Sequence, residues 1–242
     1  MRRYLLILLL LLFPTLLFAQ KKRVRHDPAY DKKPVHFGFT IGLNTMDFNV
    51  DLSGDSYAID SLYPDVSRLS PGFNIGIVSS FKLNEYFDLR ILPGITFGQR
   101  NLSYHKLFVT DTMSFNLIYN NDHKIESSFL EFPMVIKYKS KRINNFRPYL
   151  VGGFNYRLDL SARKEYDDKD AVYLRLKRSD FYYEVGFGID FYLKYFKFST
   201  ELKLAVGLRD MLIHDPAANN PQFVTAIEKL RSNLWLLSFH FE

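Results

Sequence analysis

Apolar and polar residues alternate with a period of two through most of the chain after residue 34. In the segment 181–191, apolar or aromatic side chains occupy the odd positions, while Glu184, Gly186 and Asp190 lie at even positions. This period is typical of a β-strand whose two faces meet different surroundings. It predicts eight strands, within residues 35–44, 73–82, 87–98, 130–138, 147–158, 181–191, 196–209 and 234–241, and one short helix is expected within 221–230.

The links between these strands are alternately long and short. The short links are residues 84–86, 140–145 and 192–195, and the long ones are roughly 49–71, 104–124, 161–179 and 210–231. Bacterial outer-membrane barrels have short periplasmic turns, long outer loops and an even number of strands. A sheet in hydrocarbon has to close, because an open edge leaves backbone groups unpaired. The pattern therefore predicts an all-β fold: an eight-stranded antiparallel up-and-down transmembrane β-barrel with both termini in the periplasm.

A soluble eight-stranded barrel, with its apolar face inward, is the alternative fold. Three features favour the membrane barrel. Aromatic residues mark several strand ends, where membrane proteins place them, and the last segment, 234–241, is alternating and aromatic. The third feature is a polar face that carries charge in most predicted strands, at Asp88, Arg90, Glu131, Lys137, Arg147, Glu184, Asp190, Glu201, Lys203 and Arg209.

Composition agrees with strands rather than membrane helices. Of the 242 residues, 47% are hydrophobic and 17% aromatic, yet the mean hydropathy of −0.13 is too low for a bundle of spanning helices. The chain has no cysteine. This excludes a disulfide scaffold, a thiolate metal site and a cysteine nucleophile.

The first 34 residues predict export. Arg2 and Arg3 precede an apolar run over residues 4–18 and a small residue, Ala19. The run is shorter than the roughly 20 residues of a spanning helix, so residues 1–19 are interpreted as a signal peptide. An uncleaved anchor remains the alternative, because Leu17 is large for the position three before the cut. Residues 20–34 form a flexible basic periplasmic arm, and the barrel covers residues 35–242.

The net charge does not indicate nucleic acid as a partner. Removing residues 1–19 removes two of the 32 basic residues and none of the 26 acidic ones, which lowers the formal charge from +6 to +4. Much of that remainder lies in the arm, at Lys21, Lys22, Arg23 and Arg25. The body of the protein is nearly neutral, and an exported protein does not meet the genome.

Several short motifs lie in the second half of the chain: Leu130-Glu131-Phe132-Pro133, Lys137-Tyr138-Lys139-Ser140, the run from Arg147 to Tyr156, the run from Ser179 to Gly186, and Tyr195-Phe196-Lys197-Phe198. Together they resemble the PorT family of outer-membrane barrels of the Bacteroidota. The resemblance extends over residues 73–242 and is strongest between 130 and 208. It implies a component of the type IX secretion system, which exports proteins with C-terminal signals and, in gliding species, supports adhesin traffic. The family implies no catalytic or ligand-binding residues.

The inward charges are the candidate functional residues. An eight-stranded barrel is just wide enough for side chains to fill it, and buried charges need partners. We predict a lumen charge network of Arg90, Glu131, Arg147, Arg157, Glu184 and Glu201, and no pore. The alternative is that water and counter-ions satisfy these groups separately.

Catalysis is not expected. A lipid-A-modifying enzyme would place a histidine base and a serine nucleophile on neighbouring outward positions near the outer rim. Here His36 and His240 fall on the inward face, and His105, His123 and His214 lie in predicted loops. Ser238 and His240 share a face about 7 Å apart along one strand, too far for a hydrogen bond. Asp210, His214 and Asp215 could together hold a metal ion, but residues of this kind just before Pro216 more often form a simple turn. No cofactor is expected.

Without a pore or a catalytic site, the protein is expected to function through its exposed surfaces. Long loops carry Leu107, Phe108, Val109, Ile118 and Tyr119, which either dock a partner or fold over the barrel mouth. The expected partners are outer-membrane lipid and other secretion-system proteins, with no nucleic acid and no small-molecule substrate. The predicted function is non-enzymatic support of type IX secretion. The alternatives are a lipid-A-modifying enzyme and a structural or adhesive barrel unrelated to secretion.

Overall fold

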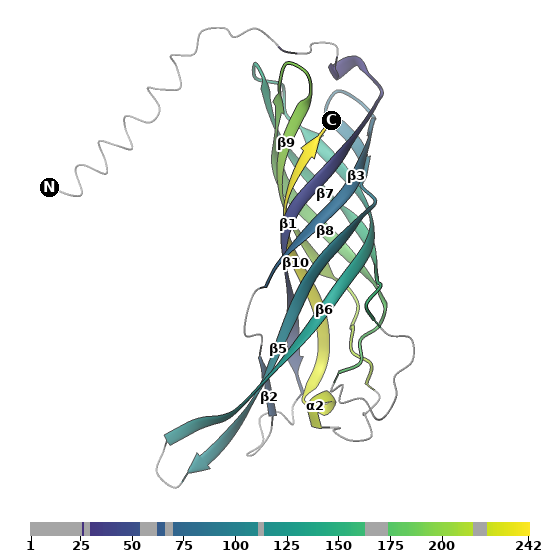
Figure 1. The fold of residues 1–242 in the computed structure, drawn as a ribbon. Coiled ribbons are helices and arrows are strands. Elements are labelled where there is room, and N and C mark those ends of the chain that lie inside the picture. Colours follow the sequence, from purple (N-terminus) through teal and green to yellow (C-terminus); the bar gives the residue numbers. More distant parts are fainter. Residues whose placement is uncertain are drawn as a thin grey trace, which may run out of the picture.

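The computed structural model describes residue 26 and residues 30–53, 62–65, 70–110, 114–162, 174–214 and 222–242. These residues form one antiparallel sheet rolled into a cylinder (Figure 1). Within them, no helix is long and apolar enough to cross a membrane. In chain order, the elements are the 3-10 turn η1 (Tyr30–Lys32), β1 (Val35–Leu52), β2 (Leu62–Asp65), β3 (Ser70–Lys82), β4 (Phe87–Ile91), β5 (Gly94–Thr110), β6 (Ser114–Lys139), β7 (Phe146–Asp159), β8 (Ser179–Tyr192), β9 (Lys197–Gly207), the helix α2 (Gln222–Thr225) and β10 (Ile227–Phe241).

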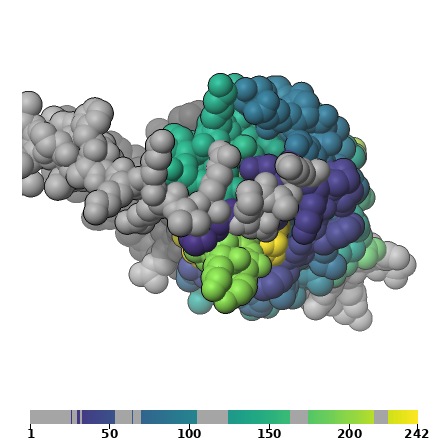
Figure 2. All heavy atoms as spheres, turned by 90° about the horizontal axis from the view of Figure 1, so that it is seen from above, coloured from purple at the N-terminus to yellow at the C-terminus, as the bar shows by residue number. Residues whose placement is uncertain are grey.

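The cylinder closes because β1 pairs on both of its edges. One edge pairs with β10, placing Phe39 opposite Phe241, and the other pairs with β3, placing Val35 opposite Phe81. Figure 2 looks along the axis and shows the purple residues of the first strand beside the yellow residues of the last. Every backbone edge within the wall therefore has a partner, as a sheet in hydrocarbon requires.

The wall consists of eight crossings. β4 and β5 together make one crossing, because both pair with β3 on one side and with β6 on the other. Leu92 and Pro93 separate them, and proline has no N–H to donate to a ladder. β2 pairs with β5 alone and lies beyond the wall. The predicted eight-stranded antiparallel barrel is confirmed.

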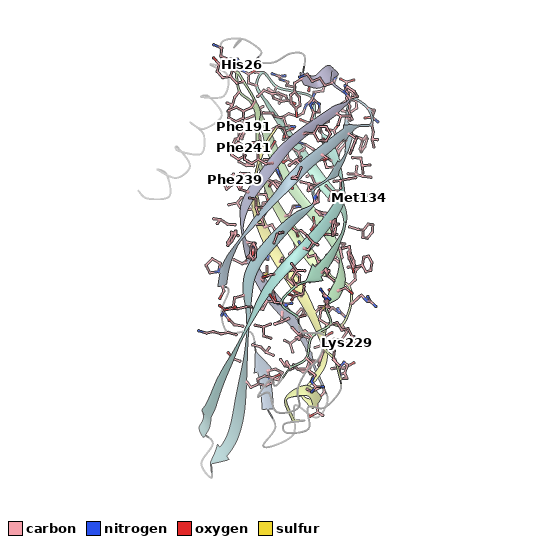
Figure 3. All side chains as sticks on the ribbon, turned by 45° about the vertical axis from the view of Figure 1, so that its right-hand side comes forward. His26, Met134, Phe191, Lys229, Phe239 and Phe241 are labelled. Atoms are coloured by element: carbon pink, nitrogen blue, oxygen red, sulfur yellow. The ribbon has the colours of Figure 1, made fainter. Side chains whose placement is uncertain are left out.

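In the wall strands, the described apolar side chains of the alternating pattern point outward. Phe37 is 68% exposed and Phe154 is 66% exposed, whereas Arg90 and Arg157 are completely buried. Met134, Phe239 and Phe241 lie on the outer wall in Figure 3. An apolar surface of this extent suits hydrocarbon and not water, so the soluble alternative is wrong.

Aromatic side chains join the first and last strands at the seam. Phe241 of β10 stacks on Phe39 of β1 with 4.8 Å between ring centroids, and it lies 5.3 Å from the ring of Phe198 in β9. Phe198 also stacks on Phe239 at 6.1 Å. Such cross-strand aromatic pairs stabilise a sheet beyond their burial, so they strengthen the joint on which closure depends.

Short turns and both ends of the barrel sequence lie at one end of the cylinder, which is the periplasmic end (Figure 1). Local chemistry fixes these turns. The Asn84 side-chain oxygen accepts hydrogen bonds from the backbone N–H groups of Tyr86 and Phe87, both at 2.8 Å. Asn144 adopts φ 54°, in the left-handed region that asparagine tolerates better than most residues. The predicted short links therefore occur where expected.

The predicted long link at 104–124 is wrong. β5 and β6 continue their pairing as far as Thr110 opposite Ser114, although pairing of β6 with β7 stops at Phe129. The result is a hairpin that projects beyond the barrel at the outer end (Figure 1). The two strands satisfy each other's backbone groups, so this hairpin needs no apolar period. In the link predicted at 49–71, β1 runs on to Leu52 and β2 adds a short strand.

The helix predicted within 221–230 is also shorter than expected. α2 ends at Thr225, and β10 begins at Ile227. Residues 227–230 pair with β1, opposite Leu52 to Val50. Residues 1–25, with the predicted signal peptide and the start of the arm, lie outside the described residues.

Gly188 leaves room for an interior aromatic ring. It pairs with Tyr149 across β8 and β7, and a Cβ atom at Gly188 would come within 2.4 Å of the Tyr149 ring and 2.5 Å of the Thr200 carbonyl oxygen. Gly152 is the matched contrast, because a Cβ there meets only the Glu184 carbonyl oxygen, at 3.9 Å.

We expect Gly188→Val to destabilise the barrel by about 1–3 kcal/mol, the usual cost of overpacking an interior. The added side chain displaces Tyr149, which donates a 2.9 Å hydrogen bond to Glu201. Heat-dependent mobility on unboiled gels measures the effect. Gly152→Val is the control and leaves the transition unchanged. Equal stability of the two variants would contradict the packing described here.

Candidate functional site

The interior of the barrel is filled mainly with charged side chains. They come from alternate positions of the wall strands. They are buried from solvent and lie close to one another. Because an unpaired charge in a low-dielectric interior is costly, the arrangement of partners decides whether the barrel is stable.

Arg157 is the centre of the first cluster. Its Nε donates to Glu131 at 2.9 Å, and its Nη2 donates to Glu184 at 3.1 Å. Asn155 donates to the same two carboxylates, at 3.2 and 2.7 Å. β6, β7 and β8 each supply part of this cluster, so the charge pairs cross-link three adjacent strands.

Glu201 is the centre of the second cluster. It accepts hydrogen bonds from Arg90 at 3.0 Å and from the Tyr149 hydroxyl at 2.9 Å. Arg90 also contacts Glu242 at 3.1 Å, and His240 lies 3.4 Å from Glu201. Arg90 and Glu201 come from opposite sides of the ring, so this pair spans the lumen.

Lys203 joins the two clusters. Its Nζ lies 3.0 Å from Glu184 and 3.7 Å from Glu201. Through it, the structure brings five of the six sequence-predicted residues into one chain of contacts: Arg90, Glu131, Arg157, Glu184 and Glu201.

Arg147 lies elsewhere. It is at the periplasmic mouth, where its Nη1 contacts Asp31 at 3.1 Å. Asp31 belongs to η1, in a segment without apolar periodicity, so the pattern of alternation gave no reason to expect this contact.

The interior also contains ion pairs between residues that are not among the six predicted ones. Lys137 contacts both oxygens of Asp190 at 2.7 and 2.8 Å, Lys139 contacts Asp88 at 2.5 Å, and Arg100 contacts Asp159 at 3.1 Å. Most of these residues lie on the same alternating polar face as the six predicted network residues. A charged residue at any inward position of a strand therefore indicates a member of the network. Arg209, on the same predicted face, is instead exposed beyond the end of β9.

Both ends of the interior are closed by side chains. At the outer end, an apolar cluster is formed by Phe48, Leu102, Tyr104, Leu174, Leu176, Met211, Leu212, Val224, Ala226, Ile227 and Leu230. The sequence did not indicate this cluster, because nine of its eleven members lie in the predicted long links, which carry no strand period.

At the periplasmic end, η1 acts as the closure. The Tyr30 ring stacks on His36 with 3.9 Å between centroids, and its hydroxyl donates to Glu242 at 2.8 Å. Burial and the nearby Glu242 carboxylate raise the pKa of the Tyr30 hydroxyl far above its ordinary value, so it remains a donor. Next to Thr40, Asn74 and His240 lies a cavity of about 20 Å³, which is room for one water molecule.

The candidates for other chemistry are scattered. Ser238 and His240 point inward and are buried. His214 Nε2 lies 2.8 Å from Asp210, whose carboxylate also accepts the backbone N–H groups of Leu212 and Leu230. Despite partial burial, these donors lower the pKa of Asp210. Asp215 lies outside the described residues, as do the side chains of His105 and His123. No group of three potential metal ligands occurs among the residues that the structure describes.

A closed antiparallel cylinder, apolar outside and charged inside, defines an outer-membrane β-barrel. Residues 18–212 match the family described as outer membrane protein beta-barrel domain, and the chain belongs to that family. The protein is therefore located in the outer membrane.

Two solved structures of Ail, the attachment invasion locus protein of Yersinia pestis, are similar in fold. Both are 12% identical to this chain and cover 86% of it. The structure in complex with the heparin analogue sucrose octasulfate has a TM-score of 0.38 with 99% of its chain covered, and the other has 0.35 with 98% covered. No curated protein matches the chain.

We expect Glu184→Ala to destabilise the barrel by about 3–5 kcal/mol, because removal of one member of a buried ion pair leaves the others uncompensated. Arg157, Lys203 and Asn155 would all lose a partner. The measurement is the temperature at which the folded form disappears on unboiled gels.

Glu228→Ala is the control, since Glu228 forms an exposed 3.8 Å pair with the neighbouring Lys229 and such surface pairs contribute little. An unchanged transition in Glu184→Ala would mean that water and counter-ions, and not side-chain pairs, balance the interior.

Proposed function

We propose that this barrel is a non-enzymatic outer-membrane component that supports type IX secretion. The observation that carries the proposal is the resemblance of residues 130–208 to PorT-family barrels. These motifs lie on β6, β7 and β8 and at the start of β9, which are adjacent strands of the wall. Their Glu131 and Glu184 belong to the same ion-pair cluster around Arg157. Two of the motifs therefore contribute to the same ion-pair cluster inside the barrel.

The filled interior supports a role at the surfaces. Ion pairs occupy the middle of the lumen, the apolar cluster occupies its outer end and η1 its periplasmic end. A folded or extended cargo chain has no passage through such an interior. We therefore assign the protein to assembly or operation of the export machine and not to conduction. Its partners are other secretion-system proteins and the surrounding lipid, with no nucleic acid and no small-molecule substrate.

The absence of enzymatic activity is part of the proposal. A lipid-A-modifying enzyme acts on a substrate in the outer leaflet, whereas Ser238 and His240 are buried inside the barrel near its periplasmic end. Export by residues 1–19, as a signal peptide, also belongs to the proposal. A structural or adhesive role is the second candidate, because the β5–β6 hairpin projects from the outer end (Figure 1).

Deletion of the gene separates these functions. We expect periplasmic accumulation of cargo with C-terminal signals, unchanged lipid A mass, and rescue by the wild-type protein. Immunoblots of periplasm and medium, with mass spectrometry of lipid A, measure the outcome. A complementing variant that lacks residues 107–117, the tip of the hairpin beyond Leu102 and Tyr104, is the matched control for an adhesive role of the hairpin. Normal export with altered lipid A, or with loss of adhesion alone, would contradict the proposal.

A further inference from the structure

A pocket of about 480 Å³ opens at the periplasmic mouth of the barrel. Its size lies within the range of about 300–1,000 Å³ typical of binding sites. The residues that line it come from η1, from the end of β3 and its turn, and from the ends of β6 and β7 with the turn between them: Asp31, Lys82, Glu85, Tyr86, Lys139, Lys141, Arg142 and Arg147.

The lining of this pocket is strongly basic. Five of its residues are cationic and two are acidic. Asp88, which pairs with Lys139 at 2.5 Å, adds a third carboxylate. The lining residues together with Asp88 then carry two more positive than negative charges. The side chains of Arg142 and Arg147 are only 1% and 9% exposed, and Arg142 also donates to the Asn144 carbonyl and the Asn145 side chain, so the wall of the pocket holds fixed and largely desolvated guanidinium groups. Such groups attract anions more strongly than fully hydrated ones.

One carboxylate already occupies part of the pocket. Asp31 contacts Arg147 at 3.1 Å and Arg142 at 3.5 Å, and it accepts a hydrogen bond from the Tyr192 hydroxyl at 3.2 Å. Arg142 is held over the Tyr192 ring, 3.6 Å from its centroid. These two guanidinium groups thus already bind one side-chain carboxylate, that of Asp31 in the same chain.

Lys82 and Lys141 extend the positive surface beyond Asp31. Lys82 donates to the backbone carbonyl of Asp31, and Lys141 is exposed in the turn between β6 and β7. Exposed charges of this kind raise association rates with an oppositely charged partner. A peptide that carries several carboxylates can contact these groups in succession.

We propose that this basic pocket is a docking site for an acidic, Asp/Glu-rich peptide segment of a periplasmic partner protein. The pocket faces the barrel axis and the periplasm. Lys139 and Arg147 point inward, whereas the adjacent Tyr138 and Phe146 are on the lipid-facing side. A phospholipid phosphate would have to leave the headgroup layer and cross the rim to reach the same cations. The proposal goes beyond the role in secretion and does not depend on it.

The test uses the full-length protein in detergent micelles and a fluorescent peptide of alternating Asp, Glu and Gly. We expect saturable binding in fluorescence anisotropy, which weakens as salt increases, and no binding of a peptide with Lys in place of the acids. Lys141→Glu weakens binding by about threefold, and Lys82→Glu with Lys141→Glu weakens it by about tenfold or more.

Lys124→Glu with Lys229→Glu is the matched control. It makes the same change in net charge on exposed residues. Lys229 lies toward the outer end (Figure 3), Lys124 lies in β6 opposite Asn101 of β5, and we expect less than a twofold effect. All variants are first checked for the heat-dependent gel shift of the folded barrel. Lys141→Glu keeps the test decisive if the double variant does not fold, because its side chain makes none of the ion pairs recorded at the mouth.

Four results would overturn the proposal. Failure of the acidic peptide to bind, or equal weakening by the control pair, would exclude specific docking. Equal binding of the Lys peptide would exclude charge recognition. Displacement of the acidic peptide by short-chain phosphatidylglycerol or by millimolar phosphate would assign the pocket to lipid headgroups or to small anions.

Discussion

The structure depends on the pairing of charges inside a closed wall. Burial of one ionised side chain in a low-dielectric interior is strongly unfavourable, and it is tolerated only where an opposite charge and further hydrogen bonds satisfy it. Arg157 meets this condition with two glutamates at 2.9 and 3.1 Å, and Lys203 links that cluster to Glu201. Because each of these pairs joins different strands, the ionic contacts also help to set the register between the strands. The apolar residues are then free to face the lipid.

Much of the fold follows from one rule about side-chain direction. Alternation with a period of two places the eight crossings and their short turns, since residues one apart point to opposite faces. The β5–β6 hairpin escapes the same rule, because strands that pair outside the membrane need no apolar face. β4 and β5 look like one strand in the sequence, and they form a single crossing interrupted at Pro93.

The interior shows a similar division. Inward residues such as Glu131 and Glu184 are recognisable from their position in the alternation, but their partners are not, because partners depend on the stagger between strands. The contact of Arg147 with Asp31 joins residues 116 positions apart, one of them in a segment with no period at all. The apolar cluster at the outer end was missed for the same reason, since Leu174 and Met211 lie in links and meet only when the barrel is closed.

With its interior filled, this barrel presents two ends of different character. The outer end has an apolar plug and a projecting hairpin, and the periplasmic end has a basic mouth with η1 bound in it. The proposed role in secretion and the proposed docking of an acidic segment both place activity at these surfaces, and both leave the lumen as the rigid support.

The outward orientation of the apolar faces is the central claim, and single-cysteine labelling tests it most directly. The chain has no cysteine of its own, so a nitroxide at Ile77→Cys or Leu150→Cys reports one site. In reconstituted bilayers, both outward sites should be accessible to oxygen and shielded from a water-soluble nickel reagent. A label at the buried inward position Ser199→Cys should be shielded from both. Ready access of the nickel reagent to positions 77 and 150 would contradict the account.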